Sequence, residues 1–340
     1  MNARSAIDAI DAHLDDDAEQ VYGRPARRTR PRTKKRPDYS EAAVGRVLTV
    51  DRGRYRCLLN GKEISAMKAR QLGRKGVIVG DQVRLVGDLS GEPGTLARIA
   101  SVDPRQTVLR RTADDSDAFE RPIVANATQL MIVSALSDPP PRPGMIDRMM
   151  IAAYDAGITP ILCLTKADLA DPSEIMSNYE PLDVTILVTE PGADLSSIYD
   201  VIRGETTVFV GHSGVGKSTL INALIPEANR ETGAVNESTG RGRHTSTSAI
   251  ALPLPELDAW VIDTPGVRSF GLSHVKLESV LGAFPDLAEF TEECPRGCTH
   301  LADEPECGLD EALLTGALTE ERLASFRRIL AALTTPNYDG

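Results

Sequence analysis

Short apolar runs separated by turn residues mark the part of the chain that follows residue 38. Within residues 39–112, β-branched and aliphatic positions form brief runs, and Gly, Asn and Asp stand between them. This spacing predicts strands joined by tight turns. The predicted strands are residues 43–50, 54–59, 77–79, 82–86 and 96–102. About five strands in so short a stretch are typical of an OB-fold β-barrel, a small barrel that binds oligonucleotides.

After residue 113 the pattern changes to apolar strands that alternate with helical segments. Residues 130–135 and 160–164 predict buried strands, and residues 144–156 predict the helix between them. This rhythm is typical of an α/β domain in which helices cover a parallel sheet, and we assign it residues 113–285. Residues 286–340 form a further predicted domain, which is α-helical because its later apolar positions recur at helical spacing.

A glycine-rich loop joins a predicted strand at residues 206–210 to a helix start at residues 219–224. The loop matches G-x-x-x-x-G-K-[ST], in which backbone N–H groups cradle phosphates. Lys217 can reach the β- and γ-phosphates, and the Ser218 hydroxyl can bind Mg²⁺. A chance glycine-rich turn is the alternative, which the flanking strand and helix disfavour. The predicted phosphate-binding residues are Gly211, His212, Ser213, Gly214, Val215, Gly216, Lys217, Ser218 and Thr219.

Charge is distributed unevenly, although the whole chain carries a formal net charge of −11. Residues 24–111 contain 22 Lys and Arg against 8 Asp and Glu, which indicates a polyanionic partner. Residues 1–38 are poor in large apolar groups and predict a disordered basic arm. We expect this arm to neutralise phosphates, with a merely solubilising tail as the alternative.

The predicted barrel is rich in arginine, and Tyr55 is the only clear aromatic residue in its strands. We therefore expect it to contact the phosphates and the shape of folded RNA rather than to stack on bases. A barrel that only spaces the other domains is the alternative. The arginines in question are Arg46, Arg52, Arg54, Arg56, Arg70 and Arg74.

No apolar run approaches the roughly 20 residues that a membrane span requires, and the acidic start of the chain differs from an export signal. We therefore expect a cytoplasmic protein that does not contact membranes. Three of its five cysteines lie between residues 294 and 307. In a reducing compartment that crowding indicates a metal site rather than disulfides.

The segment Thr165-Lys166-Ala167-Asp168 follows a predicted strand at the end where parallel sheets bind ligands. It resembles the [NT]-K-x-D element of GTPases, in which the aspartate accepts two hydrogen bonds from guanine and the lysine stem packs against the base. An Asp168 that only caps a helix is the alternative. The later segment 187–189 resembles the loop that backs the guanine, with Thr189 in place of the usual Ser-Ala.

A second nucleotide motif, Asp263-Thr264-Pro265-Gly266, follows the apolar run 259–262. Asp263 can hold Mg²⁺ through water, and the Gly266 N–H can bind the γ-phosphate. The glycine-rich stretch 240–247 and this motif would both be released when that phosphate is lost. No [NT]-K-x-D follows Asp263, so we interpret the domain as a circularly permuted P-loop GTPase domain.

The permuted order, the preceding barrel and the following Cys/His cluster together resemble the ribosome small subunit-dependent GTPases, the RsgA or YjeQ family. The resemblance covers about residues 40–330. It implies a GTPase that converts GTP to GDP, is stimulated by the small ribosomal subunit (30S), binds 16S rRNA and acts late in maturation of that subunit. It also implies that Thr165, Lys166 and Asp168 bind guanine. We expect a monomer.

His244 is the predicted catalytic residue, together with Lys217. The resemblance places His244 where the G-x-H-T-T segment of the family has a histidine implicated in hydrolysis. Val267 stands where Ras-like enzymes carry a glutamine that orients water, and valine cannot do so. Lys217 would stabilise charge in the transition state. A structural or RNA-contacting His244 is the alternative, and His212 is a weaker rival.

Cys294, Cys298, His300 and Cys307 form the pattern C-x3-C-x-H-x6-C. Four soft ligands at this spacing suit a closed tetrahedral site for one Zn²⁺. The family pattern usually has four residues in the first gap and five in the last, so one residue is shifted between loops. Free thiols are the alternative. The other two cysteines lie in predicted strands, where we expect them in the core.

Two other functions stay open from the sequence. The chain could be an RNA-docking checkpoint, in which GTP changes affinity and catalysis is incidental. It could also be a P-loop ATPase, because the base-recognition element begins with the variant Thr165. GTP turnover with and without small ribosomal subunits distinguishes a GTPase from an RNA-docking checkpoint. Affinities for GTP and ATP distinguish it from an ATPase.

Overall fold

The computed structural model describes residues 38–73, 76–112, 120–226, 249–264, 270, 272, 275–302 and 304–334. The chain divides into two units, residues 1–38 and 39–340, and the second is described here. The predicted basic arm, Arg74, His244, Gly266 and Val267 lie outside the described residues. None of the helices within those ranges is long and apolar enough to cross a membrane.

Five strands form the N-terminal barrel: β1 (Ala43–Asp51), β2 (Arg54–Leu59), β3 (Lys62–Lys68), β4 (Gln82–Gly87) and β5 (Ala97–Val102). They pair in the order β1-β2-β3-β5-β4, and β4 also pairs with β1, which closes the barrel. Alternate residues point inward, as along β2, where Tyr55 and Cys57 are buried between exposed arginines. The predicted OB-like barrel is therefore confirmed, and the Tyr55 ring belongs to its core.

Three details of the barrel and the segment after it differ from the sequence prediction. Residues 62–68 form β3, although no strand was predicted there. Residues 77–79 form no strand; Val79 makes an isolated bridge to Val124 instead. A separate hairpin of β6 (Val108–Thr112) and β7 (Glu120–Ala125) follows the barrel and was not predicted either.

The α/β domain has a sheet in the order β10-β9-β8-β11-β13-β12. Its parallel strands are β8 (Gln129–Ala135), β9 (Thr159–Thr165), β10 (Thr185–Val188), β11 (Thr206–Val210) and β13 (Ala259–Asp263). The strand β12 (Ile250–Leu254) is antiparallel to β13 and adjoins barrel strand β1 at Thr49 and Ile250. Because the parallel strands share one direction, the loops after β8, β9, β11 and β13 lie along one edge.

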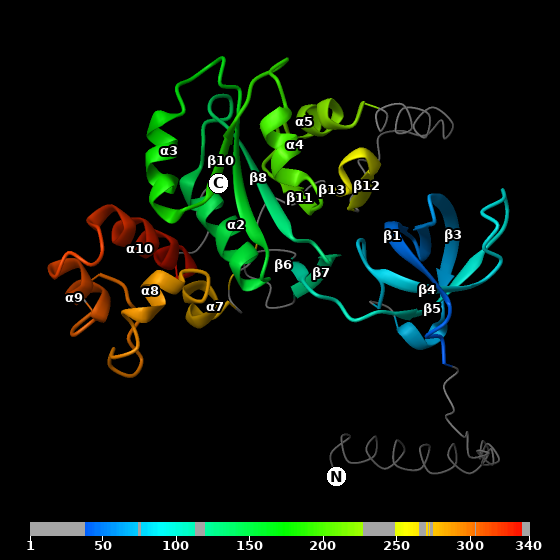
Figure 1. Cartoon of the computed structure of the whole chain (residues 1–340), viewed down its shortest axis with the longest axis horizontal. Coiled ribbons are helices and arrows are strands. Elements are labelled where there is room, and N and C mark those ends of the chain that lie inside the picture. The colour runs from blue at the N-terminus through cyan, green and yellow to red at the C-terminus, as the bar shows by residue number, and fades with distance from the viewer. Residues whose placement is uncertain are drawn as a thin grey trace, which may run out of the picture. The chain divides into compact units, whose positions relative to one another are not determined.

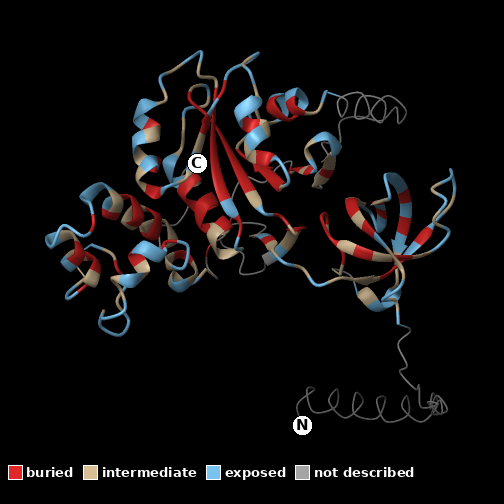
Figure 2. Cartoon of the chain, in the orientation of Figure 1, coloured by how far each residue is buried: buried red, intermediate tan, exposed pale blue. Residues whose placement is uncertain are grey.

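Helices cover both faces of this sheet (Figure 1). Leu130 and Ile132 of β8 face a core that includes α2 (Pro143–Asp155) and α3 (Ser173–Tyr179), whereas Met131 and Val133 face α4 (Ser196–Ile202) and α5 (Lys217–Leu224). Strands buried on both faces are continuously apolar, and β8 and β11 are almost wholly buried (Figure 2). Short 3-10 helices span Arg70–Leu72, Glu180–Leu182 and Pro255–Leu257.

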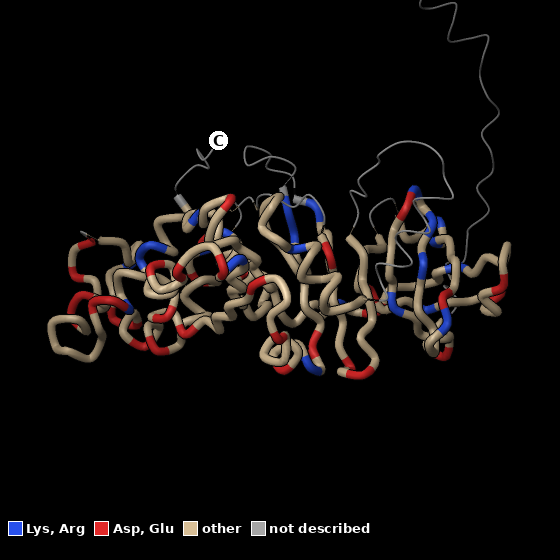
Figure 3. Tube along the Cα trace, turned by 90° about the horizontal axis from the view of Figure 1, so that it is seen from above, with Lys and Arg blue, Asp and Glu red and all other residues tan. Residues whose placement is uncertain are grey.

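The C-terminal helices α7 (Leu277–Leu281), α8 (Pro285–Glu289), α9 (Gly308–Leu314) and α10 (Glu320–Thr334) extend the core on the α2 side. Phe284 makes edge-to-face contacts with Tyr154 of α2 and Phe326 of α10, each at 5.1 Å between ring centroids. Asp and Glu are frequent on these helices, whereas Lys and Arg are frequent on the barrel (Figure 3). The helical part therefore packs onto the α/β domain through a shared apolar core.

Asp81 supplies a test of the barrel. Its carboxylate is fully buried, accepts two hydrogen bonds from Arg105 at 2.6 and 2.8 Å, and accepts a third from the Ile78 N–H at 2.7 Å. Removing one member of a buried ion pair leaves the other uncompensated. We expect Asp81→Ala to lower the free energy of unfolding by about 3 kcal/mol in urea denaturation. Glu63→Ala, which breaks an exposed pair with Arg56, is the control and should cost less than about 1 kcal/mol.

Candidate nucleotide and metal sites

The glycine-rich loop lies between β11 and α5, as its sequence predicts. Gly214 and Gly216 both have φ of +86°, a left-handed conformation that favours glycine. Gly211 is restricted by space instead, because a Cβ there would lie 2.5 Å from the Val133 carbonyl oxygen of β8. The loop can therefore turn tightly against the sheet and present its N–H groups at the start of α5.

Lys217 and Asp263 lie together at the carboxyl edge of the sheet. The Lys217 ammonium, at the start of α5, forms an ion pair with the Asp263 carboxylate at the end of β13. The strand β11, which leads into the glycine-rich loop, pairs in parallel with β13, with Phe209 opposite Asp263. Thr264, the residue after Asp263, is anchored to β11, since its buried hydroxyl donates a hydrogen bond to the Phe209 carbonyl at 2.8 Å. The two predicted phosphate and Mg²⁺ motifs thus converge, although the second is described only as far as Thr264.

Thr165 connects the predicted base-recognition loop to the phosphate loop. Its buried hydroxyl donates a 2.6 Å hydrogen bond to the Val215 carbonyl and lies 3.4 Å from the Ser134 carbonyl. On the other side of the base-recognition loop, Ala167 N–H donates to the Thr189 carbonyl at 3.2 Å. Three loops that follow β9, β10 and β11 are therefore held side by side by hydrogen bonds.

These loops line one cavity of about 180 Å³. Thr165, Lys166 and Thr189 contribute from the base-recognition side, and Gly216 and Thr219 from the phosphate side. Asp168 is exposed and is not among the residues that line this cavity. A larger hollow of about 620 Å³, between α4, the end of α5 and the β12–β13 turn, contains none of the predicted site residues.

The loop after β8 contributes a contact that the sequence prediction missed. The Lys166 ammonium donates a hydrogen bond to the Asp138 carbonyl, and the Pro139 side chain lies 3.5 Å from where a Cβ on Gly214 would stand. The signal was present, since residues 136–142 combine Asp with a run of prolines at the carboxyl end of a predicted strand. This loop forms a further wall beside Lys166 and the phosphate loop.

Comparison with known proteins shows which family has this arrangement. A family model described as RsgA GTPase matches residues 102–273. The small ribosomal subunit biogenesis GTPase RsgA of Chromohalobacter salexigens is 35% identical over 271 residues, which cover 77% of this chain and 76% of that protein. This chain belongs to the RsgA GTPase family. A relative of the same name from Alkaliphilus metalliredigens is 33% identical over 281 residues and is covered to 91% of its length.

Solved structures have the same fold as this RsgA-family chain. YjeQ from Thermotoga maritima aligns with a TM-score of 0.64 at 23% identity, covering 86% of this chain and 99% of that one. YloQ, described as a circularly permuted GTPase, aligns with a TM-score of 0.61, covering 88% and 98%. The expected permuted fold is thus confirmed, and family membership makes the chain a GTP hydrolase with a guanine nucleotide as its ligand.

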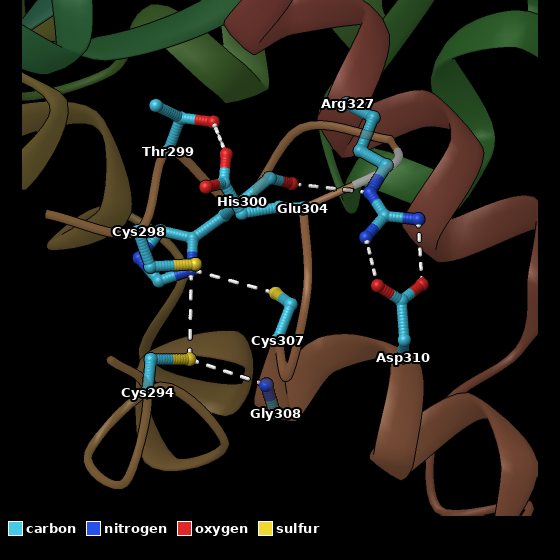
Figure 4. A network of polar contacts seen from close by, with 9 residues as sticks. All are labelled: Cys294, Cys298, Thr299, His300, Glu304, Cys307, Gly308, Asp310 and Arg327. Carbon is cyan, nitrogen blue, oxygen red and sulfur yellow. Dashed lines mark hydrogen bonds and ion pairs between the residues drawn. The ribbon is translucent and has the colours of Figure 1, made fainter. Parts of the chain in front are cut away.

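The four predicted metal ligands of this RsgA-family protein lie together between α8 and α9 (Figure 4). Their ligand atoms are all within 4.8 Å of one another. His300 Nδ1 lies 3.3 Å from the sulfur of Cys298 and 3.7 Å from each of the other two sulfurs. His300 and Cys307 are buried, and the Gly308 N–H donates to the Cys294 sulfur at 3.2 Å. This group is suited to hold a metal ion.

Arg327 of α10 supports the metal-ligand group from outside it. Its Nε donates to the His300 carbonyl at 3.1 Å, and its two terminal nitrogens donate to the Asp310 carboxylate at 2.8 and 2.7 Å. The hydrogen bonds from Arg327 lower the pKa of Asp310. This residue was not singled out from the sequence, because nothing in a helical arginine's spacing indicates which distant carbonyl it contacts.

The barrel arginines differ in how free they are to meet RNA. Arg46 is occupied, since its guanidinium hydrogen-bonds the Thr206 hydroxyl at 3.2 Å and stacks on Trp260 with its carbon 4.6 Å from the ring centroid. Arg56 pairs with Glu63. Arg52 and Arg54 are exposed at the β1–β2 turn. An RNA role for these two stays a prediction.

A Thr165→Val variant tests the link between the two loops. Valine keeps the shape of threonine but cannot donate to the Val215 carbonyl, so that buried oxygen loses its partner. We expect affinity for a fluorescent GDP analogue to fall about tenfold, as the loss of one buried hydrogen bond implies. Thr185→Val on the exposed start of β10 is the matched control, and an equal loss in both variants would contradict the assignment.

Metal content tests the cysteine and histidine group. Burial raises the pKa of the Cys298 thiol to about 11, so protons compete with a metal for this sulfur and affinity should fall as the pH is lowered. We expect plasma emission to find about one metal ion per wild-type chain and almost none in Cys298→Ser or Cys307→Ser. Cys57→Ala is the control, because that buried thiol lies in the barrel core, and retention of metal by both serine variants would contradict the site.

Proposed function

We propose that this protein hydrolyses GTP in a site built by the loops after β9, β11 and β13, with Mg²⁺ bound by Ser218 and, through water, by Asp263. Lys217 contacts the β- and γ-phosphates and stabilises the charge that develops on them during transfer. The hydrogen bond from Thr165 to the Val215 carbonyl carries the proposal. It joins a base-recognition motif to a phosphate-binding motif at one cavity, despite their inverted order in the chain.

We assign guanine recognition to Lys166 and Asp168. Lys166 lines the cavity, and its ammonium is held by the Asp138 carbonyl, so its stem is fixed along one wall. Asp168 is exposed two residues later, where a carboxylate can accept hydrogen bonds from the N1–H and the exocyclic amine of guanine. Adenine lacks that donor pair, which is why GTP is proposed over ATP.

His244 is proposed to orient the attacking water. The proposal rests on its position in the Gly240–Thr247 stretch and on Val267, which cannot form the hydrogen bond that a glutamine supplies in Ras-like enzymes. A histidine can exchange a proton near neutral pH, as this role requires. Gly266 is assigned to the γ-phosphate on its motif alone.

We propose that the metal ion is Zn²⁺. Zinc bonds of about 2.3 Å to sulfur and about 2.0 Å to nitrogen, at tetrahedral angles, separate sulfur from nitrogen by about 3.5 Å. The three sulfur-to-His300 distances of 3.3, 3.7 and 3.7 Å agree with that value. Three thiolates and one imidazole also leave no position for water, which is typical of a structural rather than a catalytic zinc.

The small ribosomal subunit is the proposed partner, and its maturation the proposed process. The curated relatives are named small ribosomal subunit biogenesis GTPases. The excess of Lys and Arg in residues 24–111 suits 16S rRNA, whose phosphates the barrel and the basic arm would contact. Binding to the 30S subunit would raise GTP turnover, and a monomer acting in the cytoplasm is sufficient for this role.

Hydrolysis assays with His244→Ala test the proposal. Wild-type protein should convert GTP slowly alone, faster with purified small subunits and little faster with free rRNA, and should leave ATP intact. The variant should lose about 100-fold of the subunit-stimulated rate, the typical worth of one proton-transfer group, while GDP affinity stays unchanged. His212→Ala tests the rival histidine of the phosphate loop: loss of the stimulated rate in this variant, with His244→Ala unaffected, would assign the water-orienting role to His212. If subunits do not accelerate the wild type, an RNA-docking checkpoint replaces this proposal.

A further inference from the structure

Arg148 is a buried arginine in the middle of α2 that contacts two distant parts of the chain. Only 8% of it is exposed. One terminal nitrogen, Nη2, donates to the Phe270 carbonyl at 3.1 Å, and the other, Nη1, donates to the Ala332 carbonyl at 3.2 Å. A guanidinium is suited to this geometry because its donors are fixed in one plane and point in different directions.

The first contact fixes the chain just beyond the second nucleotide motif. Thr264 is anchored to β11 by its hydroxyl, and Phe270 is the next described residue, with 1% of it exposed in the core shared with α2. The intervening segment contains Gly266, whose N–H is proposed to bind the γ-phosphate. Arg148 therefore determines where the chain returns to the core after that motif.

The second contact lies at the carboxyl end of α10. Ala332 belongs to the last turn of this helix, where carbonyls have no partner within the helix and the helix dipole favours a cation. The neighbouring residue of α2 strengthens the connection, because buried Asp147 pairs with Arg328 of α10 at 3.1 Å. Arg328 also stacks on the Tyr179 ring, 4.5 Å from its centroid. Two adjacent residues of α2 thus hold α10.

The same helix carries the support of the metal-ligand group. Arg327, next to Arg328, donates to the His300 carbonyl. A continuous series of contacts therefore runs from the metal ligands through α10 to α2 and on to Phe270. Chains of packed and hydrogen-bonded groups of this kind can couple distant sites.

We propose that Arg148 is a positioning residue for GTP hydrolysis, which fixes the chain at Phe270, four residues after the 263–266 motif, and ties Phe270 to α10. This inference rests on the proposed role of that motif at the γ-phosphate. Arg148 itself does not reach the nucleotide cavity. A buried guanidinium is a costly way to stabilise a core, since an apolar side chain of similar size often serves as well. The guanidinium instead aligns two backbone segments, the one at Phe270 and the one at Ala332.

Arg148→Met tests the inference, because methionine fills similar space without donors. Wild-type hydrolysis is measured first, so that failure of the proposed function itself is recognised separately. We expect the variant to have a kcat about tenfold lower than wild type, because misalignment of the 263–266 motif weakens its contact with the γ-phosphate in the transition state. Its affinity for a GDP analogue should stay within about twofold, since GDP lacks the γ-phosphate.

Arg322→Met is the matched control. Arg322 also lies on the core side of α10, where its side chain is 12% exposed, binds Asp286 at 2.9 Å and donates to the Pro181 carbonyl at 2.7 Å. It contacts neither Phe270 nor Ala332 among the described residues. We expect a lower melting temperature in both variants and an unchanged kcat only in Arg322→Met. Equal losses of kcat in both would assign Arg148 a purely structural role and overturn the inference.

Arg148→Lys covers the case in which the methionine variant does not fold. A single ammonium keeps the charge but cannot bind both carbonyls in the directions that Nη1 and Nη2 use. We expect a folded protein with kcat about threefold lower and GDP affinity unchanged. Wild-type kcat in this variant would overturn the inference.

Discussion

The hydrogen bond from the Thr165 hydroxyl to the Val215 carbonyl is the contact on which the nucleotide site depends. It joins the loop that follows β9 to the loop that follows β11. The two loops are far apart in the sequence, but their strands belong to one sheet. A parallel sheet makes this contact possible, because every strand delivers its loop to the same edge whatever the order of strands along the chain. Circular permutation therefore changes connectivity but leaves the relation between base-recognition and phosphate loops intact.

Much of the fold and of the site was predictable from local pattern. Strands buried on both faces, such as β8 and β11, are continuous apolar runs, and the phosphate loop carries its glycines where φ is positive. By contrast, β3 was missed because only Ile64 and Ala66 are buried in it, and most of their neighbours are charged or polar. Residues 77–79 were mistaken for a strand because all three are β-branched; the two valines are buried, but pairing is limited to one bridge, at Val79.

The contacts that join distant segments could not be predicted in the same way. The Arg46 sequence position suggests a free surface cation, yet its guanidinium stacks on Trp260. Asp138 acts through its backbone carbonyl, which every residue possesses, so the sequence indicated the loop but not this contact. Arg148 and Arg327 likewise bind carbonyls. Sequence motifs identify groups that meet ligands, whereas groups that align backbone become apparent only once the chain is folded.

The order of domains along the permuted chain determines which motif each one adjoins. The barrel is followed by β6 and β7 and then by β8 and β9, and the loops after these last two strands carry Asp138 and the base-recognition motif. The C-terminal helices, which flank the metal-ligand group, follow β13 and the 263–266 motif. Along the chain, the barrel therefore adjoins the motif proposed for guanine, and the C-terminal helices adjoin the motif proposed for the γ-phosphate.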